Sequence, residues 1–243
     1  MATPCTACPL RRLDCFSPME PGEIDFMQTF KSGELTVDPG SQILMEGSNS
    51  PQLFTVLEGM GLRYKTLANG RRQVVNFVWP GDFLGLQAGV MGEMGHSVEA
   101  TTRMRLCVFD RGSIWRLFQN HPQRAYDLTW LAAVEEHFLG EALSSLGQRS
   151  AIERMAWAFV RLHARAEALA LARPDGSFPL PYRQQDLADA LGLSLVHTNK
   201  TLARLRDRQL VSWNEGAVTI FDLEALADLG QAELGPPRLR PLI

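Results

Sequence analysis

Three of the four cysteines lie close together near the start of the chain. Cys5, Cys8 and Cys15 follow the spacing Cys-x2-Cys-x6-Cys, and Cys107 stands much later in an apolar run. Short spacing lets one loop direct several thiolates at a single centre, and soft thiolates suit both iron–sulfur clusters and zinc. We therefore expect Cys5, Cys8, Cys15 and Cys107 to form a metal site. Unliganded thiols in the N-terminal segment, with Cys107 as a small core residue, are the alternative.

A second chemical pattern lies between residues 182 and 209, where two short helices are predicted. Leu187, Ala190 and Leu191 share one face of the first helix. Gly192 follows where a left-handed helix cap belongs, and Ser194 stands where the N-cap of the second helix belongs. Two helices joined by so short a turn predict a helix-turn-helix. An ordinary helical hairpin with a solvated basic face is the alternative.

The second of these helices has an apolar face and a basic face. The 3.6-residue pattern predicts an inward face made of Leu195, Thr198, Leu202 and Leu205. Side chains near the start of a recognition helix reach base edges in the major groove, so Asn199 and Lys200 are expected to read bases. The predicted DNA-contacting residues are Arg183, Gln184, Ser194, Val196, His197, Asn199, Lys200, Arg204 and Arg208.

A predicted β-hairpin follows the second helix. Its strands are residues 210–213 and 217–220, and the turn between them contains Gly216. Two helices followed by a hairpin are typical of a winged helix-turn-helix, which makes DNA the expected ligand of this part of the chain.

The positioning elements upstream are short strands. Residues 19–110 alternate apolar runs with turn signals, and Asn69-Gly70 predicts a type I′ hairpin turn. Strands at such regular spacing predict a β-sandwich or barrel. The predicted strands span residues 34–37, 42–45, 53–58, 61–67, 71–78, 97–100 and 104–109.

A long helix is predicted from Ser113 to Gly147, with Pro122 in a first turn near its start. One stripe, at coiled-coil spacing, predicts a dimer seam on Ala132, Glu136, Leu139, Leu143 and Leu146. A second stripe, which is expected to pack on the chain's own β-domain, consists of Leu128, Leu131, Glu135, Phe138 and Ala142. The alternative is that both stripes pack within one chain.

Composition limits the classes of function. The chain has 243 residues and a formal net charge of −3, so any DNA contact must come from a local basic face rather than from overall charge. No apolar run approaches a membrane span and the N-terminal residues have no signal-peptide core, so a cytoplasmic location is expected.

The order of these segments resembles the CRP/FNR family of bacterial transcription regulators over nearly the whole chain. The motifs that carry the resemblance are residues 80–85, PGDFLG, and residues 185–194, QDLADALGLS. The resemblance implies an α+β fold with an N-terminal β-roll (a double-stranded β-helix, cyclic-nucleotide-binding-like), a long dimerisation helix and a C-terminal winged helix-turn-helix. The corresponding segments are a cysteine arm (1–18), the roll (19–111), the dimerisation helix (112–147), the DNA-binding domain (148–234) and a flexible tail (235–243).

Within the family, the cysteines look like those of the oxygen-sensing FNR members. There, three N-terminal cysteines and one from a roll strand hold a [4Fe–4S] cluster, and Cys5, Cys8, Cys15 and Cys107 match those roles. The gap between Cys8 and Cys15 is one residue longer than in FNR. The resemblance also implies a homodimer on a pseudo-palindromic DNA site and contact with RNA polymerase, with residues 67–72 and 90–95 as candidate loops.

Two departures from the family change the expected ligands. Members that bind cyclic AMP carry an acidic residue and an Arg-Ser pair after the PGDFLG turn, but residues 86–89 and 95–98 here contain no arginine. No cyclic nucleotide is therefore expected. Val196, Asn199 and Lys200 stand where FNR-type recognition helices have Glu, Ser and Arg. Since valine cannot accept a hydrogen bond from cytosine, the DNA target should differ from that of FNR.

We thus interpret the chain as a homodimeric transcription regulator, not an enzyme, that responds to oxygen or redox state through a [4Fe–4S] cluster. The alternative is a regulator of the same family without a cluster, controlled by another small molecule or by a protein. A catalytic cupin-like roll is disfavoured, because cupin metal sites need several histidines and this roll contains only His96.

Overall fold

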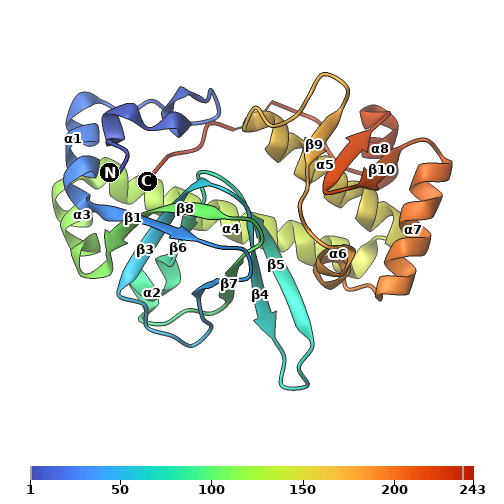
Figure 1. Cartoon of the computed structure of the whole chain (residues 1–243), viewed down its shortest axis with the longest axis horizontal. Helices are drawn as coiled ribbons and strands as arrows, with labels where there is room; N and C mark the ends of the chain where they lie inside the picture. The colour runs from blue at the N-terminus through green and yellow to red at the C-terminus, as the bar shows by residue number, and fades with distance from the viewer. Residues whose placement is uncertain (1, 237) are drawn as a thin grey trace. The chain divides into compact units, whose positions relative to one another are not determined.

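The computed structural model describes residues 2–236 and 238–243, which form two compact units (Figure 1). The first contains residues up to Glu136 together with Leu239–Ile243, and the second runs from His137 to Arg238. The chain therefore returns to its first unit after completing its second. Within the described residues, no helix is both long enough and apolar enough to span a membrane.

The first unit is a β-roll of two four-stranded antiparallel sheets. The strand orders are β1-β8-β3-β6 and β2-β7-β4-β5. Buried apolar side chains from both sheets, among them Phe54, Val98 and Leu106, form the core between them. The strands are β1 (Lys31–Val37), β2 (Gln42–Leu44), β3 (Gln52–Glu58), β4 (Gly61–Thr66), β5 (Arg72–Val78), β6 (Phe83–Leu84), β7 (Ser97–Ala100) and β8 (Met104–Asp110). All seven predicted strands are present, whereas the two-residue β6 was too short to predict.

Short helices surround this roll. The cysteine arm forms two 3₁₀ turns, η1 (Cys5–Ala7) and η2 (Pro9–Arg12), and is followed by α1 (Pro21–Phe30), which the sequence analysis missed. A further helix, α2 (Leu86–Met91), was also missed, and η3 (Arg111–Ser113) follows β8. The buried face of α1, Ile24, Met27 and Phe30, has the spacing of an amphipathic helix. It was not predicted because Pro21 and Gly22 at its start are residue types typical of turns.

The hairpin between β4 and β5 is present, but its turn is not type I′. That turn type needs positive φ at both central residues. Gly70 has φ +79°, whereas Asn69 is not among the residues with positive φ. Two consecutive positive φ angles, as in a type I′ turn, occur instead between β10 (Val211–Asn214) and β11 (Ala217–Ile220), where Glu215 and Gly216 have φ of 50° and 75°. This second turn builds the predicted wing.

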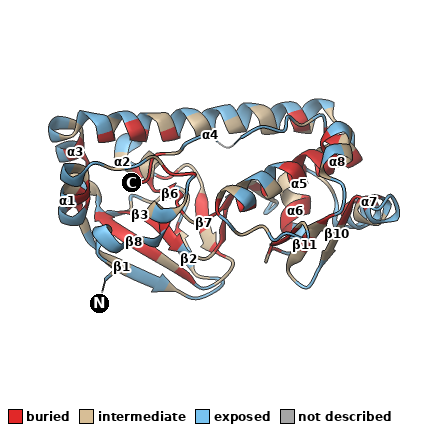
Figure 2. Cartoon of the chain, turned by 90° about the horizontal axis from the view of Figure 1, so that it is seen from above, coloured by how far each residue is buried: buried red, intermediate tan, exposed pale blue. Residues whose placement is uncertain are grey.

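The predicted long helix is interrupted once. The backbone leaves the helical region at His121, so that α3 (Ile114–Asn120) ends there and α4 (Pro122–Gln148) begins with proline at its first position. Proline is favoured at that position because its missing N–H has no helical partner there. Leu128 and Leu131 of the second predicted stripe are buried, whereas all the predicted seam residues except the half-buried Leu146 are exposed in the single chain (Figure 2).

The second unit carries the winged helix-turn-helix. It contains α5 (Ala151–Ala168), β9 (Ser177–Pro179), α6 (Gln184–Leu191), α7 (Leu195–Asp207), the hairpin β10–β11 and α8 (Leu223–Gly230). Strand β9 pairs with β11 and completes a three-stranded sheet, so the wing is broader than the predicted two-stranded hairpin. The amphipathic α5 buries Ile152, Met155 and Phe159, which share one face of the helix.

The end of the chain differs from the predicted flexible tail. Residues 241–243 are buried, and Arg240 forms a parallel bridge with Phe16 of the cysteine arm. The proline content of residues 235–243 predicted a loose segment, but Leu242 and Ile243 provide apolar surface that the roll covers. The prediction of a loose tail is therefore wrong for residues 240–243.

Phe16 packs directly on the PGDFLG turn. Gly81 has φ +85°, and a Cβ there would lie 2.2 Å from Cζ of Phe16. Glycine is thus required at position 81 for two reasons: the backbone is left-handed there, and the Phe16 ring occupies the space that a Cβ would need.

A substitution at Gly81 should therefore cost more than the same substitution at a comparable turn. Gly40 has nearly the same backbone angle, φ +82°, with no atom within 4 Å of an added Cβ. We expect Gly81→Ala to lower the free energy of unfolding by roughly 1–3 kcal/mol more than Gly40→Ala, because only the first forces the Phe16 ring to move. Urea unfolding followed by circular dichroism measures both. Equal losses of unfolding free energy in the two variants would contradict the prediction and show that the Phe16 ring moves without an energetic cost.

Candidate DNA-binding site and cysteine cavity

The turn between α6 and α7 has the geometry that the sequence predicts. Gly192 caps α6 in the left-handed region with φ +63°. Ser194 is the N-cap of α7, and its Oγ accepts a hydrogen bond from the backbone N–H of His197 at 3.2 Å. Local capping chemistry therefore fixes where the recognition helix, α7, begins.

The inward face of α7 differs from the prediction at its first residue and at the half-buried Leu202, and it includes Thr201, which was not predicted. Thr198, Thr201 and Leu205 are buried, whereas Leu195 is 40% exposed. Thr201 tolerates burial because its hydroxyl donates to the carbonyl of His197 at 2.8 Å. Leu195 stays in solvent because the first turn of α7 lies beyond the core, next to Val196, which is 65% exposed.

Most predicted DNA-contacting side chains share the exposed surface of α7. The exposed residues are Ser194, Val196, His197, Asn199, Lys200, Arg204 and Arg208. Gln184 is half-buried. Arg183 stands at the N-cap position of α6, where its backbone N–H and its guanidinium donate to the Asp186 carboxylate at 2.9 and 2.8 Å. Asp186 is buried, so the pair anchors Arg183 at the start of α6 and limits its reach.

Arg154 of α5 holds the helix-turn-helix in place, and the sequence analysis missed it. One of its terminal nitrogens donates to the carbonyl of Leu191, the last residue of α6. The other donates to the carbonyls of Leu146 and Arg149 at 3.0 and 3.1 Å. The sequence contains no clear signal for this role, because Arg154, Arg161 and Arg165 have the spacing of an ordinary polar face of α5. Satisfying helix-end carbonyls with one guanidinium fixes α6 against the end of α4.

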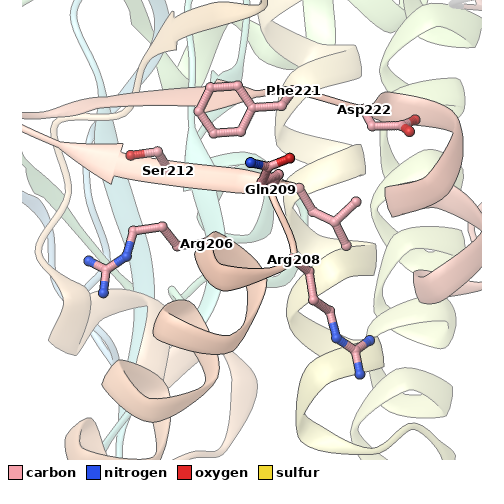
Figure 3. Close-up of a pocket in the computed structure, with 7 residues that line it drawn as sticks. Arg206, Arg208, Gln209, Ser212, Phe221 and Asp222 are labelled. Atoms are coloured by element: carbon pink, nitrogen blue, oxygen red, sulfur yellow. The ribbon is translucent and has the colours of Figure 1, made fainter.

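An open hollow of about 610 Å³ lies where α7 meets the wing. It is lined by Arg206, Arg208, Gln209, Leu210, Ser212, Phe221 and Asp222. The side chains of Arg206 and Arg208 extend in different directions from the end of α7, while Phe221 lies over the strands (Figure 3). Arg206 thus extends the basic surface beyond the predicted set.

Three of the four cysteines line one cavity in the roll. Cys5, Cys8 and Cys107 share it with apolar side chains that include Leu57, Leu242 and Ile243. Its volume is about 30 Å³, enough for one or two water molecules. Cys15 is buried but does not line this cavity. Three predicted ligands are thus brought together, and the fourth is not.

Burial favours the neutral form of two of these thiols, Cys5 and Cys107. Burial raises the pKa of Cys107 to about 11, against the opposing positive charge of Lys31. Burial also raises the pKa of Cys5. Lys31 donates to the Thr3 carbonyl and to the Glu34 carboxylate, both at 2.7 Å. A metal would have to displace protons here, because metals bind the thiolate.

The donor chemistry fits a thiolate-bound group, whereas the present spacing does not complete one. In residues 2–236 and 238–243, no three His, Cys, Asp or Glu side chains converge closely enough to hold a metal ion. Cys5, Cys8 and Cys107 are the residues that would hold it, after the arm adjusts. Cys15 would need a larger movement, since its carbonyl accepts a hydrogen bond from the Arg240 N–H at 2.8 Å.

The other functional candidate in the roll is a buried arginine. Arg63 pairs with Glu135 of α4 at 3.1 Å and donates to the Phe83 carbonyl at 3.1 Å. Asn76 donates to the same carboxylate at 3.2 Å. Arg63 is thus already engaged by groups of its own chain. Residues 86–89, where family members that bind cyclic AMP place their phosphate contacts, form part of α2.

Known proteins match both units. A model of the cyclic nucleotide-binding domain matches residues 34–121, and a model of the Crp-like helix-turn-helix domain matches residues 153–229. The chain is 30% identical over 226 residues to the nitrogen fixation regulation protein FixK of Bradyrhizobium diazoefficiens, covering 92% of this chain and 93% of that protein. It is 26% identical to the transcriptional activator protein FnrL of Cereibacter sphaeroides, covering 92% of this chain and 90% of that protein.

Among solved structures, FixK2 from Bradyrhizobium japonicum matches with a TM-score of 0.74 and 26% identity. The match covers 83% of this chain and 98% of FixK2. The order of roll, long helix and helix-turn-helix is thus shared with FixK2, and the predicted fold class is confirmed.

His96 gives the roll a predictable dependence on pH. Burial, and then the positive charges of Arg63 and Lys65, lower its pKa from 6.5 to about 4, although Glu46 opposes them. Below pH 6.5 the unfolded chain therefore takes up a proton that the folded chain does not, so stability falls from pH 6.5 to about 4. We expect His96→Gln to reduce this loss, measured as urea midpoints across that range. His197→Gln, on the exposed face of α7, is the control, and identical slopes in all three proteins would contradict the prediction.

Proposed function

Since the chain belongs to the CRP/FNR family and is a DNA-binding transcription regulator, we propose that it acts as a homodimer whose cysteine cavity responds to oxygen or redox state. The observation that supports DNA recognition most directly is the exposed polar and basic face of α7. Its position is fixed by the Ser194 cap and by Arg154, and a fixed helix can present side chains to base edges in a defined register.

Base reading is assigned to the first turns of α7. Asn199 and Lys200 are exposed and can donate to base edges, with asparagine suited to adenine and lysine to guanine. Leu195 and Val196 are also exposed there, and apolar side chains at such positions contact the methyl group of thymine. The preferred half-site therefore contains thymine next to a base read by Lys200. Arg204, Arg206 and Arg208 follow towards the other end of α7 and are assigned to phosphates.

The homodimer is supported by the apolar stripe of α4. Leu139 and Leu143 are exposed in the single chain at helical spacing, which is the arrangement that a partner helix covers. Leu146 contributes less, because it is half-buried and lies near Gly192. Glu136 is exposed in the same stripe, where a parallel pair would bring two like charges together and weaken the dimer.

Sensing is assigned to Cys5, Cys8 and Cys107, with a [4Fe–4S] cluster as the proposed cofactor and no cyclic nucleotide. When bound, such a cluster supplies redox chemistry that thiols alone do not. A second candidate, supported by the separate position of Cys15, is regulation without a cluster by another small molecule or by a protein. RNA polymerase is proposed as a partner by family analogy. The exposed Leu67, Val90 and Met91 lie in the two candidate loops.

The DNA assignment predicts different effects of two substitutions. A two-fold dimer should select a pseudo-palindrome with half-sites about 10 bp apart from a random duplex library. Lys200→Ala should lose roughly 1–3 kcal/mol of binding free energy on the selected duplex, mostly by losing preference at one base pair. Arg208→Ala should weaken binding to selected and random duplexes alike.

Fluorescence anisotropy with both duplexes at fixed salt measures these affinities. A duplex with one half-site scrambled is the control for dimeric binding. If Lys200→Ala loses the same binding free energy on the selected and the random duplex, Lys200 does not read a base.

The cofactor assignment predicts the metal content. After anaerobic reconstitution with iron and sulfide, the protein should be brown and hold about four irons per chain. Cys107→Ala should lose them. Iron analysis and the visible spectrum measure this, and Cys15→Ala shows whether the fourth cysteine is needed. Colourless protein would leave the cluster-free alternative, while stoichiometric zinc would indicate a structural thiolate site.

A further inference from the structure

The last described residues of the chain, Arg240–Ile243, are called here the tail segment, and they are bound by both the arm and the roll. The N–H of Arg240 donates to the Cys15 carbonyl at 2.8 Å, and the Ser17 N–H donates to the Arg240 carbonyl at 2.9 Å. The Arg240 guanidinium forms an ion pair with Asp82 at 2.8 Å, and both side chains are largely buried. A buried ion pair with two flanking backbone bonds specifies one docked register.

The end of the tail segment forms part of the wall of the cysteine cavity. Leu242 and Ile243 line it together with Cys5, Cys8 and Cys107. Their carbonyls are also held, that of Leu242 by Arg124 at 3.3 Å and that of Ile243 by the Thr55 hydroxyl. Apolar burial and polar contacts therefore position the segment over the thiols.

Burial in this part of the chain is selective. Leu239, which directly precedes the tail segment, is 57% exposed, whereas Leu242 is 5% exposed. The same residue type is thus in solvent at one position and covered three residues later. The burial of Leu242 therefore reflects specific contacts around the cysteine cavity rather than general collapse of a Pro-rich segment.

We propose that the tail segment is a strap that seals the wall of the cysteine cavity at Cys107, so that this buried thiol becomes accessible to solvent only when the strap is released, whereas Cys5 and Cys8 are already partly exposed. The strap belongs to the first unit, whereas Arg238 and the described residues before it back to His137 belong to the second, so its release leaves α4 as the remaining link between the two units. The consequence for DNA binding rests on the redox function proposed above, whereas the sealing role stands independently of it.

Thiol labelling of the full-length, reduced, metal-free protein tests the seal. Leu242→Asp should release the strap and raise the labelling rate of Cys107 by about tenfold or more, the scale expected from losing one buried leucine. Leu239→Asp, the matched control, should label like the wild type. A carboxylate beside a docked Cys107 would slow thiolate formation, so faster labelling reports release and not a charge effect. Peptide mass spectrometry after timed alkylation identifies the labelled cysteine.

Unchanged labelling in Leu242→Asp would overturn the proposal. Arg240→Met provides a second route, because it keeps the aliphatic stem and removes the ion pair with Asp82. It should also accelerate labelling, whereas Arg238→Met, at an exposed position two residues earlier, should not. Equal rates for these two variants would likewise contradict the seal.

DNA affinity, measured on reduced and diamide-oxidised protein, tests the connection. If the strap transmits the redox state of the cavity thiols, the wild type should bind DNA with different affinities when reduced and when oxidised. Leu242→Asp should lose this difference in DNA affinity, while Leu239→Asp should retain it. Faster labelling with an unchanged difference would confine the strap to sealing and overturn the connection. A wild type without any difference would reject the redox function itself and leave the seal to the labelling result.

Discussion

A buried ion pair between Asp82 and Arg240 joins three segments that are distant in the sequence. Asp82 belongs to the PGDFLG turn, Arg240 belongs to the tail segment, and Phe16 of the cysteine arm lies over Gly81 beside them. Leaving one charge unpaired in such a place would be costly, so the three segments are held together or not at all. The position of the cysteine arm, and with it the shape of the thiol cavity, depends on this junction.

In the DNA-binding unit, the side chain of Arg154 also holds separate segments of the chain together. Arg154 is a single cation that satisfies carbonyls at the ends of α4 and α6, together with that of Arg149. Because these bonds go to backbone atoms, the arrangement does not depend on which side chains α7 presents. Val196, Asn199 and Lys200 can therefore differ from other family members while the helix keeps its position. This separation of support from recognition lets one fold read different DNA sequences.

The parts of the fold that were predictable from sequence are those with local causes. Gly192 and Ser194 cap their helices through their own backbone and hydroxyl, and most strands were indicated by turn residues next to apolar runs. The position of Cys15 and the docking of Leu242 follow instead from contacts with residues far away in the chain, and Leu195 is exposed because the first turn of α7 lies beyond the core. Cysteine spacing predicted a shared site for Cys5 and Cys8, but spacing alone could not show that Cys15 bonds through its backbone to the tail segment.

The position of the tail segment also bears on how the protein is made. Thr55 and Ile243, which meet at the cysteine cavity, are 188 residues apart in the sequence. Contacts of such separation form late, because the intervening chain must first be closed into a loop. On a ribosome, the roll emerges before the segment that lines the cysteine cavity has been synthesised. The nascent protein therefore passes through a stage in which one wall of that cavity is missing and Cys107 lacks its cover.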